Sequence, residues 1–113
     1  MTIDTPAPNA IVARAFLVGG WALDLDETVG TGVDTLHVWA YPTAGGDPIF
    51  LGATAYGGAR PDVAAVFGDQ FKNSGYGIIV ESLPAGTYDL AVFAWGTATR
   101  GFAPAKTIRI SVR

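Results

Sequence analysis

Residues 33–41 read VDTLHVWAY, and this stretch decides the fold of the chain. Leu36, Val38 and Ala40 recur in it at every second position. Strict alternation is typical of a β-strand that buries one face, because successive side chains of a strand point to opposite sides. We therefore expect a strand here, with these three side chains in the core.

The opposite face of the same strand carries His37, Trp39 and Tyr41. Such a face is unusual for plain solvent-exposed surface, so we expect it to be covered or to bind a partner. Trp95 or Phe93, from a later strand, is expected to join these rings. The candidate binding residues are therefore His37, Trp39, Tyr41 and Trp95. The alternative is ordinary packing beneath a loop.

Further strand signals recur between clusters of Gly, Pro, Asn and Asp, which is the pattern of an all-β domain. We expect these strands over residues 2–5, 13–25, 49–56, 76–82, 87–95 and 105–112. Gly19 and Gly20 interrupt the second of them, which predicts a bulge or a close approach of another backbone. Trp21, directly after these glycines, is expected in the core.

Residues 61–67 carry the signals of a short helix, with Pro61 at its start, an acid in its first turn and a glycine after its end. Its apolar side chains are expected to close one end of the domain: Val63, Val66 and Phe67. Asp62 is placed to cap or charge the first turn. We expect Arg60 to bridge this connection to a neighbouring strand, and a ligand-gripping loop is the alternative.

Residues 83–88 read LPAGTY and match the tyrosine corner of Greek-key sandwiches, in which the hydroxyl of the tyrosine bonds to nearby backbone. The alternative is a hairpin turn with a surface Tyr88.

Together the patterns predict an all-β, immunoglobulin-like Greek-key β-sandwich of about seven strands. It has one short helical turn near 61–67 and forms a single domain over residues 1–113.

The composition points to a protein that contacts others. Half of the 113 residues are hydrophobic and only 15% are charged, so some apolar side chains must remain outside the core. Contiguous apolar patches on a surface usually mark a partner. The seven basic residues are scattered and the net charge is −3, which argues against nucleic acid as a partner. The sequence contains no apolar run of membrane-helix length and no signal-peptide pattern.

Metal binding and catalysis have little support in the residue pattern. The absence of cysteine excludes disulfides and thiolate sites. One acidic group could supply the oxygen ligands that calcium prefers: Asp24, Asp26, Glu27 and Asp34. Its alternative is a solvated acidic loop. His37 is the only histidine, and no serine lies in a nucleophile motif. We therefore expect no enzymatic activity and no cofactor apart from calcium.

Several motifs together resemble bacterial immunoglobulin-like modules of secreted and cell-surface proteins. They are GWALD (20–24), GVD (32–34), HVWAYP (37–42), YGGARPDV (56–63), FG (67–68), NSGY (73–76) and LPAGTY (83–88). The resemblance spans nearly the whole chain. It implies a spacer, adhesion or assembly role outside the cell, and it brings no catalytic residues. A virion or cytoplasmic location, and a free-standing domain or a fragment, all stay open.

These observations predict a non-enzymatic structural or assembly module that contacts copies of itself or neighbouring domains. The alternative is a carbohydrate-binding accessory module, because aromatic faces stack on sugar rings as well as anchoring protein interfaces.

Overall fold

The computed structural model describes residues Met1 to Arg113. Its strands are β1 (Thr2–Thr5), β2 (Ile11–Val12), β3 (Phe16–Trp21), β4 (Val33–Pro42), β5 (Ile49–Ala53), β6 (Ala55–Gly58), β7 (Gly75–Val80), β8 (Gly86–Gly96), β9 (Gly101–Phe102) and β10 (Lys106–Val112). An α-helix, α1 (Pro61–Phe67), and a 3-10 turn, η1 (Asp69–Phe71), lie between β6 and β7. No helix is long and apolar enough to span a membrane.

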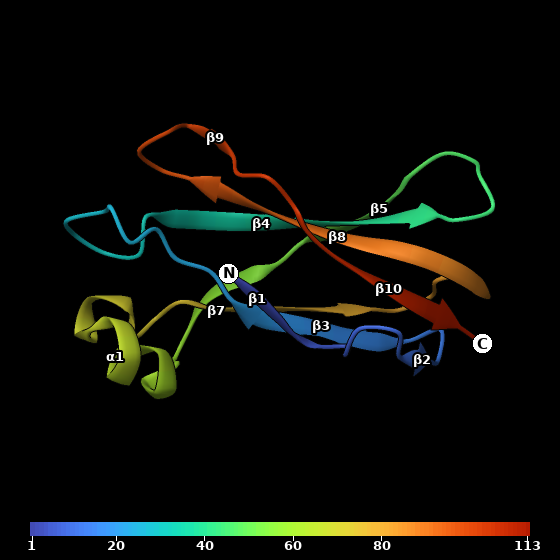
Figure 1. The fold of residues 1–113 in the computed structure, drawn as a ribbon, viewed down its shortest axis with the longest axis horizontal. Coiled ribbons are helices and arrows are strands. Elements are labelled where there is room, and N and C mark those ends of the chain that lie inside the picture. The colour runs from blue at the N-terminus through green and yellow to red at the C-terminus, as the bar shows by residue number, and fades with distance from the viewer.

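The strands form two sheets that pack face to face (Figure 1). A four-stranded sheet has the order β1-β3-β7-β6, and a six-stranded sheet has the order β2-β10-β8-β4-β5 with β9 on β8. These orders correspond to strands A-B-E-D and G-F-C of immunoglobulin domains, with β5 added beside strand C. The predicted immunoglobulin-like Greek-key sandwich is therefore confirmed.

The core lies between the two sheets and is built by alternate residues of the strands. Leu36, Val38 and Ala40 of β4 are completely buried, as the alternation predicts. Leu90 and Val92 of β8, the neighbouring strand, are buried to the same extent. The side chains between them point to the outer face of the six-stranded sheet, and this alternation positions the surface described below.

The tyrosine corner is also confirmed. The Tyr88 hydroxyl donates a hydrogen bond of 2.8 Å to the Pro84 carbonyl oxygen, and Tyr88 is buried. Antibody domains carry their second cysteine two residues after this tyrosine. Leu90 takes that position here, so an aliphatic side chain replaces half of the usual inter-sheet disulfide.

The predicted strand over residues 49–56 is wrong in one respect, because the chain changes sheets within it. β5 pairs with β4 in the six-stranded sheet, whereas β6 pairs with β7 in the other. The crossing occurs at Thr54, whose backbone N–H donates to the Leu36 carbonyl oxygen at 2.9 Å. Gly52, with φ of 134°, adopts a backbone conformation that favours glycine just before the crossing.

The close backbone approach predicted at Gly19 and Gly20 is confirmed. A Cβ atom on Gly20 would collide with the Thr2 carbonyl oxygen of β1 and would lie 3.1 Å from the Tyr76 hydroxyl. β1 can therefore pair with β3 only because this position has no side chain. The prediction for Trp21 is wrong: it is half-buried at the end of β3 and packs on Phe67 with ring centroids 5.4 Å apart.

The helix forms where it was predicted, but it does not close the end of the sandwich. Val63 is buried, whereas Val66 is 75% exposed and Phe67 is 37% exposed. A seven-residue helix beside the end of the four-stranded sheet turns only one side toward the core (Figure 1). The expectation that Val66 and Phe67 seal this end is therefore wrong.

Candidate binding surface

The outer face of the six-stranded sheet gathers aromatic side chains from four strands. The set, called the aromatic face below, consists of His37 and Trp39 on β4, Phe50 on β5, Phe93 and Trp95 on β8, and Phe102 on β9. Strand pairing brings them together, because His37 lies opposite Phe93 and Trp95 lies opposite Phe102. Directly opposed residues of antiparallel strands are close enough for their side chains to touch.

The rings of the aromatic face form one continuous cluster. His37 contacts Phe50 and Phe102, with centroid distances of 5.3 and 4.7 Å. Trp39 lies 4.9 Å from Phe50, and Trp95 lies 5.0 Å from Phe102. The angles between paired ring planes run from 46° to 77°, so neighbouring rings are tilted or meet edge to face. Such pairs are favourable, and they hold the face in a defined shape.

The aromatic face remains accessible although its rings pack on one another. Phe50 is 48% exposed and Phe102 is 43% exposed, while Trp39 and Trp95 are half-buried. The inclined rings give an uneven apolar surface and not a flat platform. A surface of this kind can be covered by an irregular apolar surface of another molecule.

The structure brings three of the four predicted binding residues together: His37, Trp39 and Trp95. Tyr41 lies on the same outer face and is 38% exposed, but its ring pairs with none of the others. Sequence analysis missed Phe50 and Phe102. Phe50 lies between the core-facing Ile49 and Leu51, and this alternation in the sequence indicates that its side chain faces outward. Phe102 follows a turn, and no periodic pattern marks it.

The end of the face at Tyr41 is polar, because Asp89 lies opposite Tyr41 and forms an ion pair with Arg109. Arg109 donates two hydrogen bonds to the Asp89 carboxylate, at 3.0 and 3.2 Å. This pairing lowers the pKa of Asp89 and raises the pKa of Arg109. The two opposite charges therefore offset each other on the sheet surface.

His37 lies among aromatic side chains. Its ring contacts Phe50 and Phe102, one on each side along the sheet. Ser74 is completely buried, and its hydroxyl has no hydrogen-bond partner. The Ser111 hydroxyl lies 3.5 Å from the Thr87 hydroxyl. No base, nucleophile and orienting carboxylate come together around His37.

The four predicted calcium ligands are not brought together as a site. The Asp24 carboxylate accepts a hydrogen bond of 2.9 Å from the Asp26 backbone, and the Glu27 carboxylate accepts one of 3.0 Å from the Thr28 backbone. Asp34 is exposed on β4. No three acidic or histidine side chains form a group that could hold a metal ion. Calcium binding stays a prediction from the sequence.

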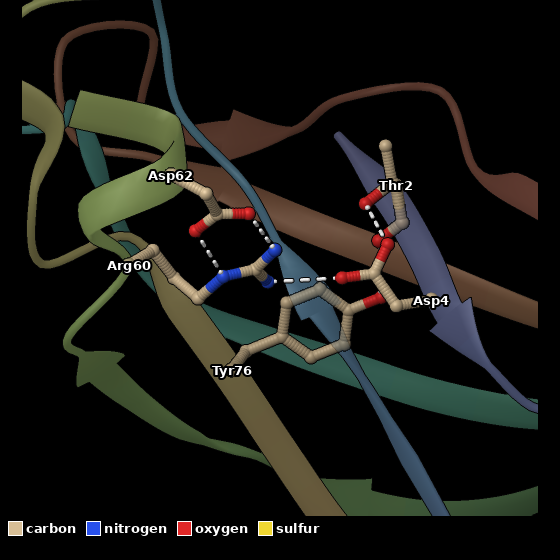
Figure 2. A network of polar contacts seen from close by, with 5 residues as sticks. All are labelled: Thr2, Asp4, Arg60, Asp62 and Tyr76. Atoms are coloured by element: carbon tan, nitrogen blue, oxygen red, sulfur yellow. Dashed lines mark hydrogen bonds and ion pairs between the residues drawn. The ribbon is translucent and has the colours of Figure 1, made fainter. Parts of the chain in front are cut away.

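Arg60 joins the start of α1 to the edge strand β1, as predicted (Figure 2). Its guanidinium donates to Asp62 at 2.7 and 3.0 Å and to Asp4 at 2.9 Å. The Thr2 hydroxyl donates to Asp4, and the Tyr76 hydroxyl donates to the Thr2 carbonyl oxygen at 2.8 Å (Figure 2). Asp62 is the acid in the first turn of α1, as predicted, and its carboxylate also binds Arg60, the N-cap residue, which forms no side-chain cap.

The same contacts shift the ionisation of the Arg60 network. Hydrogen bonding by Arg60 lowers the pKa of Asp62, and burial raises the pKa of Tyr76. A carboxylate with a lowered pKa stabilises the folded chain at neutral pH, and this contribution is lost as the pH falls through that lowered value. Arg60 therefore links the start of α1 to β1 through two carboxylates of the chain, which is a structural role, and the ligand-gripping loop stays a prediction from the sequence.

Replacing Arg60 by methionine should lower the free energy of unfolding by about 1 kcal/mol, because Asp4 and Asp62 lose their partner while the network is largely solvent-screened. Urea unfolding measures the change. Arg14→Met is the matched control, since Arg14 is exposed and forms no ion pair. Equal stability of the two variants would contradict a bridging role of Arg60.

Fold and surface together define a small immunoglobulin-like β-sandwich with an accessible aromatic face. No protein-family model and no curated protein matches the chain.

Proposed function

We propose that the chain is a non-enzymatic assembly module that binds a second copy of itself through the aromatic face. The resemblance of the sequence to bacterial immunoglobulin-like modules extends the proposal to a surface, secreted or filamentous assembly. Neighbouring domains with a similar surface are the other partners that the proposal includes.

The exposure of the aromatic face carries the proposal. Phe50 and Phe102 leave almost half of their surface in water, next to two half-buried tryptophans. Large aromatic side chains are the usual anchors of protein interfaces, and exposed apolar patches of this kind mark contact sites.

Charge and size support a second copy as the partner. The Asp89–Arg109 pair leaves the polar end of the face neutral, so two copies can approach without strong repulsion. The same face on both copies would form an isologous contact, the commonest kind in homodimers. The molecule measures 42 × 26 × 19 Å, which leaves room for the roughly 800 Å² per partner of a standard interface.

A carbohydrate-binding accessory module is the alternative function. The surface position of Trp39 and Trp95 favours it, because indole rings stack on sugars. The packing of each indole against a phenylalanine favours the protein contact instead, because it leaves both tryptophans only half-exposed.

The combined substitution Phe50→Ser and Phe102→Ser should weaken self-association at least about tenfold, because it removes two aromatic anchors. Sedimentation velocity over a concentration series measures the dissociation constant. Leu17→Ser with Ile79→Ser is the matched control, since these opposed residues of β3 and β7 are 51% and 69% exposed on the other sheet. The control should associate like the unmodified chain.

Two outcomes would overturn the proposal. One is an unmodified chain that stays monomeric at millimolar concentration. The other is dissociation by the Leu17 and Ile79 substitutions but not by those at Phe50 and Phe102. Binding on a glycan array that depends on Phe50 and Phe102, by a monomeric chain, would favour the carbohydrate function.

A further inference from the structure

A cleft of about 550 Å³ opens at the end of the sandwich that α1 leaves unsealed. The segment 22–32, the turn after β8 and α1 all lie at this end, on the left of Figure 1. Apolar side chains from both sheets and from α1 line the cleft: Trp21, Leu23, Val33, Phe67, Ala94 and Pro104. Clefts of this size and composition are typical of ligand sites.

An aromatic pair forms one wall of the cleft. Trp21 and Phe67 approach to 5.4 Å with their planes inclined by 54°. Phe67 is 37% exposed, and Leu25 at the same cleft is 61% exposed. The rim of the cleft is therefore apolar and open to solvent at both positions. An occupant that covers the exposed Leu25 as well as filling the cleft extends beyond the cleft itself, as a peptide segment does.

The charged side chains that line the cleft are both acidic: Asp24 and Asp26. Neither forms an ion pair with another residue. Met1 also lines the cleft, and burial, with a smaller effect of Lys106, lowers the pKa of its amino group. The two carboxylates outnumber the single amino group, so the lining favours a cation, and an ammonium group is further favoured near the face of an indole ring.

We propose that the cleft binds a lysine-bearing segment of a partner protein. The aliphatic part of the lysine lies against Trp21 and Phe67, and its ammonium group approaches Asp24 and Asp26. Apolar residues beside the lysine cover Leu25. This site lies at the end of the sandwich and is separate from the aromatic face, so it does not depend on self-association.

A titration followed by ¹H–¹⁵N NMR tests this proposal with the peptide acetyl-Leu-Lys-Leu-amide. We expect the Trp21 indole and the amides of residues 24–26 to shift. The peptide with norleucine in place of lysine should bind at least about tenfold more weakly, because it keeps the alkyl chain and lacks the charge. The variant Asp24→Asn with Asp26→Asn should lose this preference, while Phe50→Ser with Phe102→Ser keeps it.

The carboxamide that Asp24→Asn introduces can still accept the hydrogen bond from the backbone N–H of residue 26, so the double variant should stay folded, and its NMR spectrum verifies this directly. The proposal is overturned if millimolar lysine peptide leaves Trp21 unshifted, or if the norleucine peptide binds equally well. It is also overturned if propyltrimethylammonium binds and the peptide does not, which would assign the cleft to a small ammonium compound. None of these results bears on the aromatic face.

Discussion

Replacing Leu90 by alanine should lower the free energy of unfolding by about 3 kcal/mol, because Leu→Ala changes in a closed core lose buried methyl groups and leave a cavity. Leu90 is completely buried in β8, where it lies opposite Ala40 of β4 and Ile108 of β10. No disulfide holds the two sheets together at this point, so packing alone must do so.

Urea unfolding followed by tryptophan fluorescence measures this change. Leu17→Ala is the matched control, since its side chain is 51% exposed and its loss should cost no more than about 0.5 kcal/mol. If Leu90→Ala fails to fold, Leu90→Val supplies a milder test, with about 1 kcal/mol expected. Equal stability of the Leu90 and Leu17 variants would contradict the core described above.

Replacing Gly20 by alanine should lower the free energy of unfolding by about 2–4 kcal/mol, because the new methyl group forces β1 away from β3 and breaks a packed hydrogen-bond network. The added Cβ would lie 2.9 Å from the Thr2 carbonyl carbon and 3.1 Å from the Tyr76 hydroxyl. Amide hydrogen exchange should increase first in β1.

Gly77→Ala is a close control for Gly20→Ala, since it lies on the neighbouring strand β7. There the nearest atom to an added Cβ, the Val18 carbonyl oxygen, is 3.7 Å away, which is ordinary contact. Alanine also reduces the entropy of the unfolded chain, so this variant should be unchanged or slightly more stable. Similar losses at positions 20 and 77 would contradict the close approach of β1.

The sequence predicts features of the fold that depend on local periodicity. Leu36, Val38 and Ala40 are buried because every second side chain of a strand points to the same face, and this face of the strand lies on the core. The sheet change at Thr54 has no such signal, because residues on both sides of it favour β-strands. Which sheet each half joins depends on the partners it meets, and these are distant in the sequence.

The candidate surface also combines residues that local periodicity predicts with residues that pairing between distant segments brings in. His37, Trp39 and Trp95 follow from alternation within their own strands. Phe102 joins them only because the short β9 folds back on β8. Phe50 lies opposite Trp39 because the register of β4 and β5 shifts between Val38 and Trp39. A bulge of this kind is set by tertiary packing and is not visible in the residue pattern.

The parallel pairing of β2 with β10 has a mechanical consequence. Three backbone hydrogen bonds join the two segments, from Asn9 to Arg109, from Ser111 to Ala10 and from Arg113 to Val12. Because the strands run in the same direction, tension that pulls Met1 and Arg113 apart loads all of these bonds in shear at once. Stretching the chain in this way then requires the simultaneous rupture of these bonds.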